Sequence, residues 1–210
     1  MINILAVDDH VLIRKGMKQI LEDTHDLRVT GEAENGMQAL KMVQAGAYDL
    51  VLLDINLPDK NGIEVLQQIK IYQPRLPVLI LSTYAEDQYA LRSIKSGAAG
   101  YLNKRSAPDQ LVIAIRQVAA GKKYISKELA EQLADGLSEG YQDLLHQTLS
   151  NREYQTLCLL ASGKKLSEMA EIMSLSTKTV SEYRARLLVK MKLKNNAEAI
   201  QYAINNHLIS

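Results

Sequence analysis

The sequence predicts an α/β fold, a doubly wound five-stranded parallel sheet, followed by a small all-α domain. Short apolar segments alternate with amphipathic segments through the first 120 residues. Most of the apolar segments are continuous, as is typical of a parallel sheet covered on both faces. After Lys127 the strand pattern stops and only helical spacing follows.

The predicted strands are short and end at polar residues or loops. The clearest has four apolar residues and stops at Asp54. Right-handed crossovers between parallel strands leave few topologies, of which the doubly wound sheet is the simplest. The strands are expected at Ile2–Val7, Arg28–Glu34, Leu50–Leu53, Val78–Leu81 and Gly100–Leu102.

The segments between these strands have apolar residues at helical spacing. Gly97 and Gly121 follow two of them as residues that end a helix, and Pro108 stands in the first turn of another. The helices are expected at Val11–Leu21, Gly36–Gly46, Gly62–Tyr72, Glu86–Ser96 and Pro108–Ala120.

A linker is expected between two domains, residues 1–121 and residues 148–210. Glycines and scattered polar residues mark Gly136–Thr148 as linker, and Lys127–Asp135 is a candidate short helix within residues 122–147. Further helices are expected at 150–161, 166–173, 177–190 and 196–206.

The composition favours a soluble cytoplasmic protein. No apolar run reaches 18 residues, so no membrane span is expected. Asp8 and Asp9 interrupt the N-terminus before a signal-peptide core could form. Cys158, the only cysteine, can form no intramolecular disulfide and is expected to be buried. Residues 148–210 carry nine Lys and Arg against five acids, which favours a polyanionic partner for that domain.

Polar residues stand at the carboxyl ends of four predicted strands. Asp8 and Asp9 end the first, Asp54 the third and Ser82 the fourth, and Lys104 follows the fifth. Ligand sites in open parallel sheets lie at this edge. Crowded carboxylates favour Mg²⁺, a carboxylate can attack phosphorus, and a lysine can neutralise phosphoryl charge. The set predicts a phosphoryl-transfer site, although any member alone could be a turn former or helix cap.

Residues 1–121 resemble the flavodoxin-like receiver domain of two-component response regulators. The resemblance lies in "ILAVDDHVLIRKGM", "YDLVLLDINLPDKNGIEVL", "VLILSTY" and "SIKSGAAGYLNK". It implies that Asp54 accepts a phosphoryl group from a phosphohistidine of a sensor histidine kinase. It also implies a Mg²⁺ site made by Asp8, Asp9, Asp54 and the backbone carbonyl of Asn56.

The same resemblance implies a switch around the phosphoryl group. Lys104 would contact it, Ser82 would close onto it, and Tyr101 would swing inward. Ser82 stands where threonine is common, and its hydroxyl preserves the function. Arg105 stands where proline is often found, which excludes a cis bond to proline there. The alternative for Tyr101 is a half-buried aromatic residue of a strand.

Two predicted helices joined by a three-residue turn, Ser174–Ser176, indicate a helix-turn-helix. Ser176 suits the N-cap of the second helix, whose outer side is polar and basic. The alternative is a helical hairpin with a solvated outer face. The outer residues are Lys178, Thr179, Ser181, Glu182, Ala185 and Arg186, with Arg184 near the boundary.

Residues 149–203 resemble the LuxR-type helix-turn-helix of the NarL/FixJ class, through "LSNREYQTLCLLASGKKLSEMAEIMSLSTKTVSEYRARLLVKMKLKNNAEAIQYA". The resemblance places the motif at about 166–185 and implies binding to double-stranded promoter DNA. Ala197–Asn205 resembles a dimerisation helix, although its apolar residues could equally be core. The implied phosphate contacts are Lys178, Thr179, Arg184, Arg186 and Lys190, and the implied base contacts are Ser181, Glu182 and Ala185.

Together these features predict a transcriptional response regulator that a kinase activates at Asp54, that dimerises when phosphorylated or DNA-bound, and that turns over no substrate. A haloacid-dehalogenase-type phosphatase is disfavoured, because such enzymes carry a second Asp where this chain has Asn56. A constitutive DNA-binding protein is disfavoured by the complete acidic set. A flavin protein is disfavoured because the first loop, residues 8–10, lacks a phosphate cradle.

Overall fold

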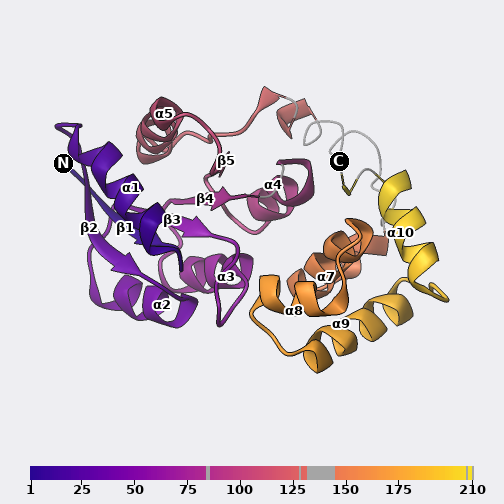
Figure 1. Ribbon diagram of the computed structural model, residues 1–210. Helices are drawn as coiled ribbons and strands as arrows, with labels where there is room; N and C mark the ends of the chain where they lie inside the picture. The colour runs from indigo at the N-terminus through magenta and orange to yellow at the C-terminus, as the bar shows by residue number, and fades with distance from the viewer. Residues whose placement is uncertain (84–85, 128, 132–144, 207, 210) are drawn as a thin grey trace. The chain divides into compact units, whose positions relative to one another are not determined.

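The computed structural model describes residues 1–83, 86–127, 129–131, 145–206 and 208–209. The chain forms two compact units, Met1–Lys127 and Glu128–Ser210 (Figure 1). No helix within these described ranges is long and apolar enough to cross a membrane.

The first unit contains an all-parallel five-stranded sheet in the order β2-β1-β3-β4-β5. The chain moves outward from β1 to β2 and then returns past β1 to β3, so the direction of strand order reverses between β1 and β3. Open parallel sheets bind ligands at such a reversal. The strands are β1 (Ile2–Val7), β2 (Leu27–Ala33), β3 (Leu50–Asp54), β4 (Val78–Ser82) and β5 (Gly100–Asn103).

Helices cover both faces of this sheet (Figure 1). One face packs against α1 and α5 through a core that includes Met17, Leu52, Leu79 and Ile115, all nearly or fully buried. The helices α2, α3 and α4 pack on the other face (Figure 1). The bounds are α1 (Val11–Glu22), α2 (Gly36–Ala45), α3 (Gly62–Tyr72), α4 (Glu86–Lys95) and α5 (Pro108–Ala119).

The predicted fold class is confirmed, with element ends that differ by one residue at most. Three strands continue one residue further than predicted, to Asp54, Ser82 and Asn103. Asp54 is in register with Leu81, and Ser82 with Asn103, so these polar residues still belong to the parallel ladder. Two residues of the predicted site are therefore held by the sheet itself.

The beginning of the predicted linker packs onto the first unit. The backbone N–H of Tyr124 donates to the carbonyl of Ala99 over 3.0 Å, and its carbonyl accepts from Tyr101 over 3.1 Å. Its hydroxyl donates to Gln110 over 2.8 Å. Residues 127 and 129–131 are helical, and the rest of the predicted linker helix lies outside the described residues.

The second unit is helical, and α7 packs against α8, α9 and α10. A capping box begins α7, in which Ser150 and Glu153 satisfy each other's backbone N–H groups. Cys158 of α7 is buried, as predicted. The bounds are the 3₁₀ helix η1 (Leu145–Thr148), α7 (Asn151–Ala161), α8 (Leu166–Met173), α9 (Thr177–Lys190) and α10 (Asn196–Asn205).

A tight turn joins α8 to α9. Ser174 adopts the left-handed conformation, with φ 53°, which ends α8 abruptly. The Ser176 hydroxyl then accepts the backbone N–H of Thr179 over 3.1 Å and caps α9, as the sequence predicted. Met169, Met173 and Val180 close the core between the two helices.

Candidate functional site

The carboxyl edge of the sheet carries two buried carboxylates that share one ammonium group. Nζ of Lys104 lies 2.6 Å from Oδ2 of Asp8 and 2.7 Å from Oδ2 of Asp54. All three side chains are at most 7% exposed. The backbone N–H of Lys104 donates to the carbonyl of Ser82 over 2.8 Å, which ties the lysine loop to the end of β4. The residues that follow β1 and β5 thus meet the last residue of β3, as the sequence predicted.

This arrangement destabilises the charged form of Asp54. Burial raises the pKa of Asp54 most and the charge of Asp8 adds to this, whereas Lys104 and a hydrogen bond from the Asn56 backbone lower it. The balance of these effects leaves the pKa of Asp54 at about 6, above its ordinary value. Burial lowers the pKa of Lys104, but Asp54 and Asp8 outweigh it and raise that pKa above its ordinary value. Lys104 is therefore a permanent cation between two carboxylates.

Asp9 and His10 extend the cluster toward solvent. Nδ1 of His10 lies 2.7 Å from Oδ1 of Asp9 and 3.1 Å from Oδ1 of Asp8. One possible ligand atom each from Asp8, Asp9, His10 and Asp54 falls within a 4.8 Å span. Oxygen donors this close together are compatible with a divalent cation. Asp9 does not cap α1, because the N-cap residue is His10 and no side chain caps that end.

Arg14 is a buried member of this region that sequence reasoning missed. Its Nη1 donates to the backbone carbonyl of Asp8 over 2.6 Å, and its side chain is 5% exposed. It also pairs with Glu32 over 3.2 Å and with Glu34 over 2.8 Å. Arg14 therefore fixes the turn that presents the Asp8 and Asp9 carboxylates. The available signal was a basic residue four positions after His10, on the sheet side of α1.

The loop after β3 is shaped by Gly62 and Asn61. The Asn61 side chain accepts the backbone N–H of Ile63 over 2.9 Å and caps α3. A Cβ at Gly62 would collide with the backbone carbonyl oxygen of Asp54, so only glycine fits. An antiparallel bridge between Asn56 and Asn61 closes the loop. The loop thereby keeps Asn56 beside Asp54.

Ser82 ends β4, which lies beside β3, and Tyr101 lies on β5, on the far side of β4. Ser82 is 1% exposed and follows Leu81, the register partner of Asp54, so it lies at the same sheet edge. Tyr101 is 2% exposed and is in register with Ile80. Tyr101 is thus fully buried, rather than the half-buried strand aromatic considered as an alternative.

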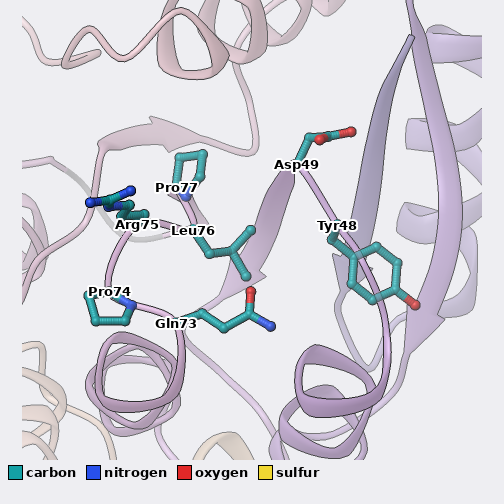
Figure 2. Close-up of a pocket in the computed structure, with 7 residues that line it drawn as sticks. All are labelled: Tyr48, Asp49, Gln73, Pro74, Arg75, Leu76 and Pro77. Atoms are coloured by element: carbon teal, nitrogen blue, oxygen red, sulfur yellow. The ribbon is translucent and has the colours of Figure 1, made fainter.

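A separate hollow of about 490 Å³ lies at the opposite edge of the sheet. It is formed by the segments that precede β3 and β4, with Tyr48 and Asp49 on one side and residues 73–77 on the other (Figure 2). Because it opens at the amino ends of these strands, it shares no residue with the acidic cluster.

The outer side of α9 carries most of the predicted DNA contacts. Lys178, Glu182, Ala185 and Arg186 are exposed. Thr179, Ser181 and Arg184 are half-buried, since they lie nearer the core side of the helix. A polar, basic face on the second helix of a helix-turn-helix suits the major groove of DNA.

Two basic residues of α9 also have partners within the unit. Nζ of Lys190 lies 2.6 Å from Oε2 of Glu153, and the Arg186 guanidinium lies 4.6 Å above the ring of Tyr183. Burial opposes ionisation of Glu153, but hydrogen bonds from Lys190 and Ser150 outweigh it and hold its pKa below the ordinary value. Glu153 therefore joins the start of α7 to the end of α9, which sequence spacing did not reveal.

The apolar residues of α10 divide between the core of the unit and its surface. Ala199 and Ala203 are fully buried in the unit. Ala197 is exposed, and Ile204 is 49% exposed. The helix therefore contributes to the core and also presents an apolar outer edge.

Comparison with protein families identifies the first unit. A family described as the response regulator receiver domain matches residues 4–116, more than half of the chain. The chain belongs to the response regulators. A second family, bacterial regulatory proteins of the luxR family, matches residues 147–203 of this response regulator. The protein is therefore a DNA-binding transcriptional regulator of the two-component type, and its family is not one of enzymes.

Curated relatives match nearly the full length of this response regulator. It is 37% identical over 209 residues to response regulator UvrY of Escherichia coli O6:H1, covering 99% of this chain and 96% of the relative. It is 34% identical over 210 residues to response regulator GacA of Pseudomonas aeruginosa, covering 100% of this chain and 98% of the relative.

Solved structures give the same result for the fold. A LuxR-family two-component response regulator from Aurantimonas sp. SI85-9A1 is 30% identical, with a TM-score of 0.60 over 66% of this chain and 99% of that one. RcsB from Salmonella enterica serovar Typhimurium, bound to promoter P1flhDC with phosphomimetic BeF₃⁻, is 24% identical. Its TM-score is 0.63, over 96% of this chain and 97% of that one.

Proposed function

We propose that Asp54 is the phosphoacceptor of this response regulator. The observation that carries the proposal is the Lys104 ammonium, held 2.7 Å from Oδ2 of Asp54 at the carboxyl edge of the sheet. This cation is placed to neutralise charge on a phosphoryl group as it is transferred. Receiver domains take phosphoryl groups from kinases, and the donor proposed here is the phosphohistidine of a sensor histidine kinase.

The transfer itself is a displacement at phosphorus. A carboxylate oxygen of Asp54 attacks the phosphorus atom and forms a P–O bond. The P–N bond to the kinase imidazole breaks, its electron pair stays on the nitrogen, and the imidazole takes up a proton from solvent when required. The Asn56 backbone hydrogen bond and Lys104 hold the Asp54 carboxylate in place during this step.

Asp8, Asp9 and Asp54, with the backbone carbonyl of Asn56, are proposed to hold Mg²⁺. The fit is supported by the donor set, since carboxylate oxygens from the loop after β1 and from the end of β3 lie within the 4.8 Å span. When bound, the cation would neutralise phosphoryl oxygens. This chain's residues would supply the oxygen ligands. Arg14 anchors the turn that carries Asp8, and Lys104 binds Oδ2 of Asp8, which leaves Oδ1 for the cation.

Phosphorylation of Asp54 is further proposed to rearrange the side chains around it. Ser82 and Lys104 are proposed to move onto the phosphoryl group, which adds roughly −1.5 to −2 charge at Asp54, and Tyr101 is proposed to repack with them. The response is proposed to favour dimers and DNA binding. The proposed domains are a receiver at residues 1–121 and a DNA-binding domain at residues 148–210, joined by a linker at residues 122–147. The protein is proposed to act in the cytoplasm.

The proposed DNA contacts divide by chemistry. Lys178, Thr179, Arg184 and Arg186 are assigned to phosphates, with Lys190 available only in competition with Glu153. Ser181, Glu182 and Ala185 are assigned to base edges, and Glu182 suits a cytosine amino group. The exposed Ala197 and Ile204 of α10 are proposed to face a second copy on DNA.

Phosphorylation by a small-molecule donor tests the phosphoacceptor. The full chain, incubated with acetyl phosphate and Mg²⁺, is expected to gain one phosphoryl group that hydroxylamine removes, as it does from acyl phosphates. Asp54→Asn is expected to gain none, and Asp59→Asn, which leaves a carboxylate at 54, is expected to gain it normally. Modification of Asp54→Asn to the same extent would contradict the assignment.

A further inference from the structure

The acidic cluster contains a nitrogen donor. The His10 ring presents Nδ1 2.7 Å from Oδ1 of Asp9 and 3.1 Å from Oδ1 of Asp8. The ligand atoms of Asp8, Asp9, His10 and Asp54 all lie within 4.8 Å of one another. A site built from these residues would therefore be a mixed carboxylate and imidazole site.

Lys104 and His10 contact opposite oxygens of the cluster. The lysine contacts Oδ2 of Asp8 and Oδ2 of Asp54, whereas the imidazole contacts Oδ1 of Asp8 and Oδ1 of Asp9. The oxygens on the His10 side are the ones that the lysine leaves for a cation. Nδ1 thus stands with the two Oδ1 atoms as a compact set of one nitrogen and two oxygens.

The backbone fixes His10 in this position. Its N–H donates to Oδ1 of Asp8 over 2.9 Å, and as the N-cap residue of α1 it has an extended backbone. Its side chain makes no capping hydrogen bond to the helix. The side chain is 64% exposed, so burial contributes little to its place in the folded domain. Folding alone therefore gives little reason for an imidazole at this point.

We propose that His10 is a metal ligand that makes this receiver prefer first-row transition-metal dications over Mg²⁺. Imidazole nitrogen suits Co²⁺, Ni²⁺ and Zn²⁺, while Mg²⁺ takes oxygen ligands and keeps much of its water. The inference rests on the proposed cation site at Asp8, Asp9 and Asp54. Its consequence is a receiver whose cation loading depends on which metals are available.

Calorimetric titration of the full chain with MgCl₂ and with CoCl₂ tests this ligand. His10→Asn is expected to weaken Co²⁺ binding by about tenfold or more, as loss of a metal's protein partners does, and to leave Mg²⁺ affinity within about twofold, because Mg²⁺ binding needs only oxygens. The matched control is His25→Asn, since His25 is an exposed histidine in the loop before β2. Hyperfine-shifted imidazole protons from bound Co²⁺ are expected in wild type and in His25→Asn, and to be lost in His10→Asn.

The outcomes separate this inference from the site on which it rests. Equal effects of His10→Asn on both cations, or no effect on either, would overturn the role of His10. Asp9→Asn is expected to weaken both cations. If Asp9→Asn and Asp54→Asn both bind Mg²⁺ as wild type does, the proposed Mg²⁺ site itself is wrong.

Discussion

The ammonium of Lys104 lies 2.7 Å from Oδ2 of Asp54, and neither side chain is more than 7% exposed. The same ammonium also binds Asp8, so one cation compensates two buried carboxylates. This imbalance keeps the pKa of Asp54 at about 6, above its ordinary value, chiefly through burial. The unmodified receiver therefore holds an uncompensated negative charge among these carboxylates, which a bound cation or a proton can neutralise.

Replacing Asp54 with asparagine should stabilise the receiver at neutral pH in metal-free buffer. Because the pKa of Asp54 is raised on folding, the folded state binds the proton more tightly, so stability falls as pH rises from about 4 to about 6. Asp54→Asn removes this pH-dependent loss of stability, so its free energy of unfolding at pH 7 should be higher by an amount on the order of 2–3 kcal/mol. Chemical denaturation at pH 4 and pH 7 measures it.

The control for this prediction is Asp23→Asn, at an exposed carboxylate that follows α1. It should change stability little at either pH. A gain from Asp54→Asn that is the same at pH 4 and pH 7 would show that burial of the Asp54 charge is not its cause.

Two glycine substitutions should have opposite effects. Gly62→Ala forces a Cβ onto the carbonyl oxygen of Asp54 and should destabilise the receiver by about 1–3 kcal/mol, or more if the backbone cannot yield. Gly16→Ala lies within α1 with open space around it and should stabilise by roughly 0.5–1 kcal/mol. Thermal unfolding of both variants checks the pair, and a tolerated Gly62→Ala would refute the close packing of that loop.

The edge of the sheet was predictable because strand ends are local signals. Apolar runs that stop at Asp8, Asp54 and Ser82 give both the strands and the polar edge, since parallel strands share their carboxyl edge. Lys104 was predicted by the same pattern, because it follows the end of the fifth predicted strand. These residues meet through backbone register, which periodicity encodes.

Contacts between side chains from distant elements were not predictable in this way. Arg14 pairs with Glu32 and Glu34 across α1 and β2, and Glu153 pairs with Lys190 across 37 positions. Such pairs depend on helix rotation and packing, and a buried charge in an amphipathic helix looks like an ordinary surface charge in sequence. The role proposed for His10 likewise depends on its contacts with Asp8 and Asp9, which a single histidine in the sequence does not reveal.

Glu153 should stabilise the DNA-binding unit through its capping box and its bond to Lys190. Glu153→Ala should cost about 1–3 kcal/mol, whereas Glu153→Gln keeps the capping hydrogen bond and should cost less. Because ionic contacts hold the pKa of Glu153 below its ordinary value, their stabilisation is present above pH 4.5 and is lost as pH falls through the lower folded pKa. Urea unfolding of the variants between pH 3 and pH 7 measures this, and an unchanged acid limb in Glu153→Gln would contradict it.

Two substitutions on α9 should separate affinity from sequence preference. Lys178→Ala should weaken binding to all sequences alike and reduce the slope of log affinity against log salt by about 1. Glu182→Ala should instead relax the choice of base at one position, by roughly 1–3 kcal/mol of discrimination. Binding to a randomised duplex library at several salt concentrations distinguishes them. A change of base preference in Lys178→Ala would reverse the assignment.

The measurement that tests the central claim most directly is DNA binding across random promoter fragments, with and without acetyl phosphate and Mg²⁺, at fixed salt. Wild type is expected to bind a subset of fragments selectively and to bind them more tightly after phosphorylation. Asp54→Asn is expected to bind the same fragments with no tightening. Tightening of Asp54→Asn by the phosphodonor, or selective binding by wild type that ignores it, would contradict control of DNA binding through Asp54.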